Sequence, residues 1–131
     1  MAGMQIKLTQ LFVDDQDAAR DFFTEKLGFL VKTDAAYSPA SRWLNLVSPD
    51  APDGVELLLT VPDDTARAYR DNLYARGTPA TAFVTTDIDK DYATLVERGV
   101  TFTLAPTRMD YGGTDAMFED GQGNFLALHQ D

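Results

Sequence analysis

The sequence has no cysteine and a single histidine, and these two shortages exclude several kinds of chemistry. Without cysteine there is no disulfide and no thiol nucleophile. One histidine leaves little material for a Ser-His-Asp arrangement, and no serine or threonine lies in a nucleophile elbow. We therefore expect neither a disulfide framework nor covalent catalysis by a triad.

Long apolar runs are also missing. No run approaches the ~20 residues that cross a bilayer. Residues 1–7 lack both the charged and the apolar part of a signal peptide. These observations predict a cytoplasmic protein with no membrane partner.

Basic residues are scarce, at 11 against 21 acidic residues, and the net charge is −10. Over most of the surface this charge would repel a phosphate backbone, so we expect no nucleic-acid partner. The same field favours a cationic small molecule, although a solvated acidic surface that aids solubility is the plainer interpretation.

A degraded internal repeat organises the chain. Residues 13–29 and 86–102 both contain an acidic residue able to cap a helix, then apolar residues at helical spacing, a charged last turn, a glycine and a new apolar strand. The two glycines, Gly28 and Gly99, are 71 positions apart. Because 131 residues is the size of one ordinary domain, we expect a single domain, 1–131, built from two related modules.

Each module follows the order β-α-β-β-β. Alternation, turn residues and helical spacing place the modules at 5–61 and 80–131, joined by a linker at 62–79 with a short helix at 64–75. The strands are expected at 6–13, 29–33, 43–47, 55–61, 80–85, 101–104, 115–118 and 125–129, and the second module's helix at 88–98.

Two glycine-rich segments lack the strand-loop-helix context of a phosphate loop. Residues 119–124 fit a tight reversal between antiparallel strands. Residues 107–113, which contain Arg108 and Tyr111, either turn or cover a site. We therefore expect no nucleotide cofactor.

Several of these segments together resemble one protein family. They are a strand ending in Val13-Asp14-Asp15, a helix with Asp21-Phe22-Phe23 that closes on Lys26-Leu27-Gly28-Phe29, a strand with Gly54-Val55-Glu56-Leu57, and Phe118-Glu119-Asp120 followed by Gly123-Asn124. The sequence resembles the vicinal oxygen chelate superfamily, which includes glyoxalase I, extradiol dioxygenases, and fosfomycin- and bleomycin-resistance proteins. The resemblance implies an α+β fold in which two βαβββ modules form a curled, mostly antiparallel mixed sheet. It does not specify an activity.

The metal enzymes of that family place ligands on the first and last strand of each module, on the concave side of the sheet. Carried over to this chain, the four positions are Leu8, Glu56, Thr81 and Ala127. Glu56 alone is a usual ligand, whereas a divalent ion needs three or four converging nitrogen or oxygen donors. We therefore expect no metal and no cofactor.

A shifted metal site is an alternative that stays open. By strand alternation, Gln10 and His129 share the face of the lost ligands and would join Glu56. Against this, His129 lies two residues from the end of the sequence, where an exposed ring is expected. Glu56 is otherwise a recognition group, a partly exposed acid or a low-ranking candidate for a catalytic base.

Strand parity predicts which side chains line the concave face. Aromatic and aliphatic residues dominate, with a few polar ones, which is typical of a small-molecule pocket. The predicted ligand-binding residues are Leu8, Gln10, Phe12, Trp43, Asn45, Glu56, Leu58, Thr81, Phe83, Arg108, Tyr111, Met117, Phe125, Ala127 and His129.

Two functions remain open. The first, favoured because metal ligands are missing, is a metal-independent protein similar to the bleomycin-resistance branch, which sequesters a natural product in an acidic, aromatic cavity. This ligand is expected to be hydrophobic, and a cationic one is left open. The second is a glyoxalase- or dioxygenase-like enzyme with an atypical metal site, or a metal-free lyase or isomerase with Glu56 as base.

The oligomeric state is predicted from the same resemblance. Two-module members of the family look like homodimers, so we expect a homodimer here. The linker residues Tyr69, Leu73 and Tyr74 are more apolar than a solvated connection requires. They agree with either a dimer contact or a cover for the chain's own core.

Overall fold

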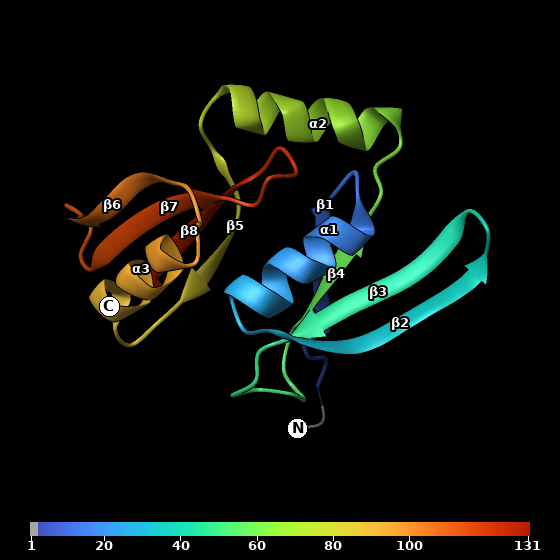
Figure 1. Ribbon diagram of the computed structural model, residues 1–131, viewed down its shortest axis with the longest axis horizontal. Helices are drawn as coiled ribbons and strands as arrows, with labels where there is room; N and C mark the ends of the chain where they lie inside the picture. Colours follow the sequence, from blue (N-terminus) through green and yellow to red (C-terminus); the bar gives the residue numbers. More distant parts are fainter. Residues whose placement is uncertain (1–2) are drawn as a thin grey trace. The chain divides into compact units, whose positions relative to one another are not determined.

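The computed structural model describes residues 3–131 and divides into two compact units, one up to Val61 and one from Pro62 onward (Figure 1). Each unit contains a four-stranded mixed sheet, and three α-helices accompany the two sheets within the described residues. The predicted α+β fold with two βαβββ modules is confirmed. No helix in this part of the chain is both long and apolar enough to cross a membrane.

The first unit begins with a strand and a capped helix. The side chain of Asp15 accepts a hydrogen bond from the backbone N–H of Ala18 at 3.0 Å, which caps the first turn. Gly28 follows the helical segment with a φ of +79°, which a residue with a side chain rarely adopts. The elements are β1 (Leu8–Phe12), α1 (Gln16–Asp21), the π-helical turn η1 (Phe22–Lys26), β2 (Leu30–Ser38), β3 (Ser41–Val47) and β4 (Glu56–Thr60).

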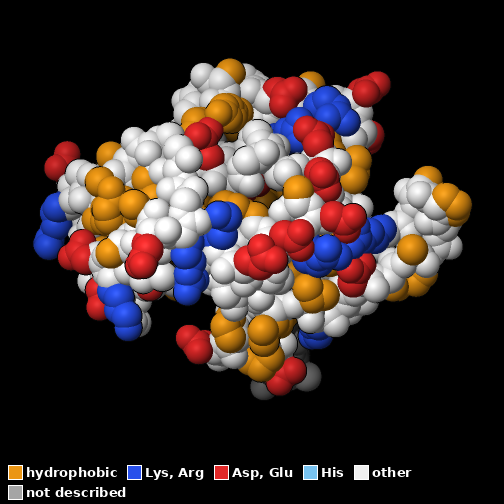
Figure 2. Space-filling model, viewed as in Figure 1, with side chains coloured by type: hydrophobic (Ala, Val, Ile, Leu, Met, Phe, Trp, Pro, Cys, Tyr) orange, Lys and Arg blue, Asp and Glu red, His pale blue; other side chains and the backbone are white. Residues whose placement is uncertain are grey.

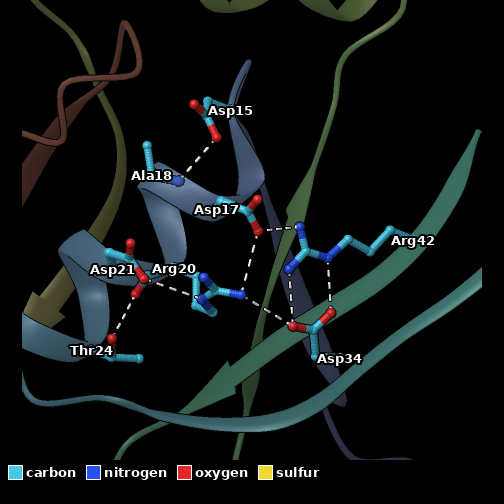
Figure 3. Close-up of polar contacts among 8 residues, drawn as sticks. All are labelled: Asp15, Asp17, Ala18, Arg20, Asp21, Thr24, Asp34 and Arg42. Carbon is cyan, nitrogen blue, oxygen red and sulfur yellow. Dashed lines mark hydrogen bonds and ion pairs between the residues drawn. The ribbon is translucent and has the colours of Figure 1, made fainter.

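Strand order in this unit is β1-β4-β3-β2, with β1 parallel to β4 and the other pairs antiparallel. Helix α1 lies on the face that carries Asp34 and Arg42, because Asp17 of α1 contacts the Arg42 guanidinium at 2.8 Å and Arg42 contacts Asp34 at 2.8 Å (Figure 3). Leu44, the register partner of Asp34, is fully buried on this face. The core between α1 and the sheet contains Leu11, Val13, Ala19, Phe23, Leu44, Leu46, Leu57 and Leu59.

The hairpin of β2 and β3 is longer than the sequence pattern predicts. Strands were expected at 29–33 and 43–47, whereas β2 continues to Ser38 and β3 starts at Ser41. β3 pairs with β4 at Asn45 and Leu46, and beyond them it runs beside β2 as a projecting hairpin (Figure 1). Small and polar residues dominate 34–42, so the alternation of apolar residues that marks a strand is missing there.

The second unit repeats the topology behind a leading helix. Its elements are α2 (Asp64–Ala75), β5 (Pro79–Val84), α3 (Ile88–Glu97), β6 (Phe102–Arg108), β7 (Thr114–Glu119) and β8 (Phe125–Gln130). Strand order is β5-β8-β7-β6, with β5 parallel to β8. Helix α3 covers the face that carries Phe102, because the Tyr92 ring of α3 lies 4.7 Å from the Phe102 ring and Phe102 lies 5.4 Å from Phe118. The Tyr92 ring of α3 therefore packs against the core of this unit.

The linker helix packs on its own unit. The Tyr74 ring of α2 stacks on Phe125 of β8 with centroids 4.4 Å apart, and the Tyr74 hydroxyl donates to Glu119. Tyr74 thus contacts the chain's own sheet, which is one of the two interpretations left open for the apolar linker residues. Tyr69 of the same helix is exposed.

The register of β5 differs from the prediction by one residue. An irregularity between Pro79 and Thr81 shifts the pairing, so that Thr81 is in register with Leu126 and Phe83 with Leu128. Leu126 and Leu128 belong to the buried face beneath α3, and the Phe83 ring stacks 6.5 Å from Phe118. The predicted placement of Thr81 and Phe83 beside Ala127 and His129 is therefore wrong, because an irregular residue in a strand reverses every following side chain.

Strand β6 also extends past its predicted end at residue 104 to Arg108. Arg108 is in register with Thr114, two positions before the buried Ala116, which places it on the α3 side of the sheet. The expectation that Arg108 reaches the opposite face from a loop is therefore wrong. The turn itself is confined to residues 109–113.

Candidate functional site

Seven of the predicted ligand-binding residues lie together on the face of the first sheet opposite α1. The register pairs Leu8 with Glu56, Gln10 with Leu58, and Asn45 with Leu58. Paired residues share a face, so strand pairing brings these side chains together. The set is Leu8, Gln10, Phe12, Trp43, Asn45, Glu56 and Leu58, and we call this surface the Glu56 face.

Glu56 is the centre of a polar cluster on this face. Its side chain is only 3% exposed, and both carboxylate oxygens accept hydrogen bonds. The Lys7 and Lys32 ammonium groups donate to Oε2 at 2.7 and 3.0 Å, and the Asn45 amide donates to Oε1 at 2.5 Å. A buried carboxylate needs this compensation, because an unpaired one would be costly to desolvate.

The backbone places both lysines beside Glu56. The Glu56 N–H donates to the Lys7 carbonyl at 3.0 Å, which fixes the start of the β1–β4 pairing next to Lys7. Lys32 lies at the irregularity of β2 between Val31 and Thr33. Val31 is in register with Leu46 on the α1 face, so alternation places the next side chain, Lys32, on the Glu56 face. Parity places Lys7 on the other face, because it precedes Leu8, and no residue of the strand expected at 29–33 was among those predicted to line the concave face. Sequence reasoning therefore missed both lysines. Alternation with Val31 was the one signal available for Lys32.

The two lysines hold Glu56 ionised. The hydrogen bond from Lys7 is the largest influence and that from Lys32 the next, and together they outweigh desolvation and lower the pKa of Glu56 from 4.5 to about 2. At neutral pH Glu56 is therefore an anion whose oxygens are engaged. A general base works best when its pKa lies near the working pH, so this carboxylate is a poor one.

The four positions that the family's metal enzymes use do not provide a metal site here. Leu8 and Ala127 have no donor atom, Thr81 lies on the helix-covered face of its sheet, and Glu56 is paired with two ammonium groups. In residues 3–131, no group of three or more His, Asp or Glu side chains is arranged to hold a metal ion. The side chains present therefore do not fit a divalent ion with three or four converging donors.

The second sheet presents a different set on its face opposite α3. The register pairs His129 with Asp115, Ala127 with Met117, and Phe125 with Glu119. Tyr111 joins this face from the 109–113 turn, because its hydroxyl donates to Asp115 Oδ2. Of the predicted residues, Tyr111, Met117, Phe125, Ala127 and His129 therefore lie together here, and we call this surface the His129 face.

His129 lies between two carboxylates. Its Nδ1 contacts Asp115 Oδ1, and its Nε2 lies 2.8 Å from Asp131 Oδ1. Hydrogen bonding to Asp115, followed by that to Asp131, raises the pKa of His129 above 6.5, since both nitrogens meet an acceptor when the ring is protonated. Burial works to raise the pKa of Asp115, but the hydrogen bonds from Tyr111 and His129 outweigh it and lower that pKa.

The contacts of Glu56 and His129 do not support the shifted metal site of Gln10, Glu56 and His129. Glu56 is held by Lys7, Lys32 and Asn45 within the first unit, and both nitrogens of His129 are engaged within the second. A ring with a raised pKa is also a poor metal ligand, because the ion binds neutral imidazole.

Comparison with known proteins agrees with this fold. The sequence model described as Glyoxalase/Bleomycin resistance protein/Dioxygenase superfamily matches residues 5–128. The uncharacterized protein YurT of Bacillus subtilis is 46% identical over 128 residues, which covers 97% of this chain and 99% of YurT. A superfamily member from Sphaerobacter thermophilus has a solved structure with a TM-score of 0.78 at 30% identity, covering 98% of both chains.

A second solved structure carries a description of what it binds. TnmS3, described as an antibiotic binding protein from Streptomyces sp. CB03234, has a TM-score of 0.78 at 30% identity and covers 99% of this chain and 98% of TnmS3. Together with the match over residues 5–128, these similarities show that the chain belongs to the Glyoxalase/Bleomycin resistance protein/Dioxygenase superfamily.

Proposed function

We propose that the protein binds a small organic molecule without a metal ion and releases it unchanged. The observation that carries this proposal is the state of Glu56. It is the one usual ligand among the four positions of the metal enzymes, and its two oxygens are engaged by Lys7, Lys32 and Asn45. A carboxylate held in this way supports neither ion binding nor proton abstraction.

Apolar and aromatic side chains next to Glu56 support an organic ligand. Trp43 is exposed, and Leu8 and Phe12 are half-buried. Side chains of this kind, with a few polar groups among them, are the usual lining of small-molecule sites. The similarity to TnmS3, which is described as an antibiotic binding protein, supports a natural product as the ligand.

Metal content tests the metal-free part of the proposal. We expect protein purified without added metal or chelator to hold far less than one zinc, nickel, manganese or iron per chain, and to take up none after incubation with each ion. The measurement is elemental analysis of wild type and Glu56→Ala. One tightly held ion per chain that is lost in Glu56→Ala would overturn the proposal in favour of an enzyme.

Binding of an uncharged aromatic probe tests whether the protein binds a small organic molecule. N-phenyl-1-naphthylamine, whose fluorescence rises on transfer from water to apolar surroundings, is expected to bind saturably to the full chain. Natural-product mixtures should be incubated with the protein, recovered and analysed by mass spectrometry. We expect the masses of the recovered compounds to be unchanged. Absence of saturable binding, or a consistent mass change in a recovered compound, would contradict a binding protein without turnover.

The proposal includes a homodimer, as expected from the sequence. The projecting β2–β3 hairpin exposes Tyr37 and Trp43, which are large apolar side chains for a surface. Light scattering after size-exclusion chromatography should give twice the chain mass of 14.4 kDa. A mass of one chain across the micromolar range would remove the dimer but leave ligand binding untouched.

A further inference from the structure

The charge of the Glu56 face has the opposite sign to that of the whole chain. The chain carries a net charge of −10, yet the Glu56 cluster combines two lysines with one carboxylate and so carries +1. Among the described residues that strand register places on this face, Glu56 is the single acid. The sequence-based expectation of a cationic ligand rested on the total charge, and the local charge points the other way.

Both ammonium groups are close together and incompletely used. They lie within 3.0 Å of the same Glu56 oxygen, so their nitrogens are no more than about 6 Å apart. Each ammonium has three N–H donors and gives one to Glu56, which leaves two on each. A second anionic oxygen would find donors from both lysines and would balance the remaining charge.

The surroundings favour an anion attached to an apolar body. Lys7 is 71% exposed along its side chain, so its ammonium is open to a ligand arriving from solvent. Leu8 is in register with Glu56, and Leu58 is in register with Gln10 and Asn45, so aliphatic side chains flank the charged groups. Apolar neighbours strengthen a charge-assisted hydrogen bond because they exclude water from it.

We propose that the small molecule bound by this protein is an aromatic or otherwise apolar acid whose anionic group is held by Lys7 and Lys32 on the Glu56 face. This inference rests on the proposed function, because it names the ligand class for that same surface. Glu56 then balances part of the charge of the two ammonium groups and competes with the ligand for their N–H donors. The inference replaces a cationic ligand with an anionic one.

Two fluorescent probes of nearly equal shape distinguish the contribution of the acidic group to binding from that of the apolar ring system. 8-Anilinonaphthalene-1-sulfonate has a sulfonate, and N-phenyl-1-naphthylamine has the same ring system without it. We expect Lys7→Gln and Lys32→Gln each to weaken binding of the sulfonate ~10-fold, because a hydrogen bond to a charged group contributes about that factor. Binding of the uncharged probe should change less than ~2-fold.

The matched control is Lys90→Gln, which makes the same change in total charge at an exposed position of helix α3 in the second unit. It should leave both probes bound as in wild type. Glu56→Gln removes the competing carboxylate and should tighten sulfonate binding several-fold. Lys7→Gln leaves Glu56 with Lys32 and Asn45, so this variant and Glu56→Gln carry the test if Lys32→Gln fails to fold, as judged by circular dichroism.

The outcomes separate this inference from the proposed function. If wild type binds neither probe, the proposed function fails and the inference fails with it. If wild type binds the uncharged probe and the lysine variants affect both probes equally or neither, only the inference is overturned. Weaker sulfonate binding in Glu56→Gln would also overturn it, because the carboxylate would then be helping the anion to bind.

Discussion

Gly113 packs directly against the ring of His129. A Cβ built on Gly113 would lie 2.7 Å from His129 Cε1 and 2.6 Å from the carbonyl oxygen of Gln130, both closer than real Cβ contacts. The φ of Gly113 is +78°, so the backbone conformation also favours glycine. The 109–113 turn therefore lies on the imidazole with no room for a side chain, and it fixes one side of the His129 face.

Substitution of this glycine should be more costly than that of its neighbour. Gly112 also has a positive φ, of +99°, but a Cβ there would meet nothing within 4 Å. We expect Gly112→Ala to cost about 1–2 kcal/mol from backbone strain, and Gly113→Ala to cost a further 1–3 kcal/mol or so from overpacking against His129. Urea denaturation of both variants measures the difference. Equal losses would contradict the close packing of the turn on the ring.

The Glu56 cluster should make stability depend on pH in acid. Because the pKa of Glu56 is lowered from 4.5 to about 2 in the folded chain, its contribution is complete above pH 4.5 and is lost as the pH falls through about 2. We expect Glu56→Gln to have a flatter decline in stability between pH 4.5 and pH 2 than wild type. Urea midpoints at pH 6, 4, 3 and 2.5 test this, and parallel curves for the two proteins would rule it out.

His129 should make stability depend on pH in the opposite direction. Its folded pKa is raised above 6.5, so its contribution is complete below pH 6.5 and is lost as the pH rises through the folded value. Since the chain has one histidine, its imidazole gives one Cε1–H resonance in a proton NMR spectrum. We expect that resonance to titrate above pH 6.5, and Asp115→Asn to move the titration down. An unchanged titration midpoint of His129 in Asp115→Asn would show that Asp115 does not stabilise the protonated imidazole.

The ion pairs between α1 and the hairpin should stabilise the first unit modestly. Asp17 and Arg20 of α1 converge with Asp34 of β2 and Arg42 of β3 (Figure 3), and acidic and basic side chains gather over α1 and the adjoining part of β3 (Figure 2). The Arg42 guanidinium contacts both oxygens of Asp34, at 2.8 and 2.9 Å. A double-mutant cycle with Asp34→Ala and Arg42→Ala should give a coupling of about 1 kcal/mol that decreases in 1 M salt. A coupling near zero at low salt would mean that the contact contributes nothing.

Local signals in the sequence predicted the helices well. An acidic cap was expected for α1 and α3, and the carboxylates of Asp15 and Asp87 provide it; α2 has the predicted bounds of 64–75. Cap residues, helical spacing and a closing glycine act within a few positions of one another, so a pattern search can recognise them. The succession of strands along the chain was predicted for the same reason, since turn residues bound each strand.

Contacts set by long-range pairing were not predicted. The irregularity between Pro79 and Thr81 depends on how β5 meets β8, and no local pattern marks it. It decides that Thr81 and Phe83 join the core beneath α3. In the first unit, the pairing of β1 and β3 with β4 and of β2 with β3 decides that Lys7 and Lys32 both reach Glu56. The sequence identified Glu56 as the carboxylate of interest but not the two lysines that determine its chemistry.

The parallel pairing of first and last strands also governs how the chain folds. Leu8 pairs with Glu56 and Thr81 with Leu126, at separations of 48 and 45 residues. Such closures lose chain entropy before they gain contacts, so they form late and slowly. Each closure is completed within its own half, and the first sheet has all its strands before Pro62 is reached. During synthesis, all strands of the first sheet are therefore made before those of the second. The slow closure of the first sheet can begin while the second half of the chain is still being synthesised.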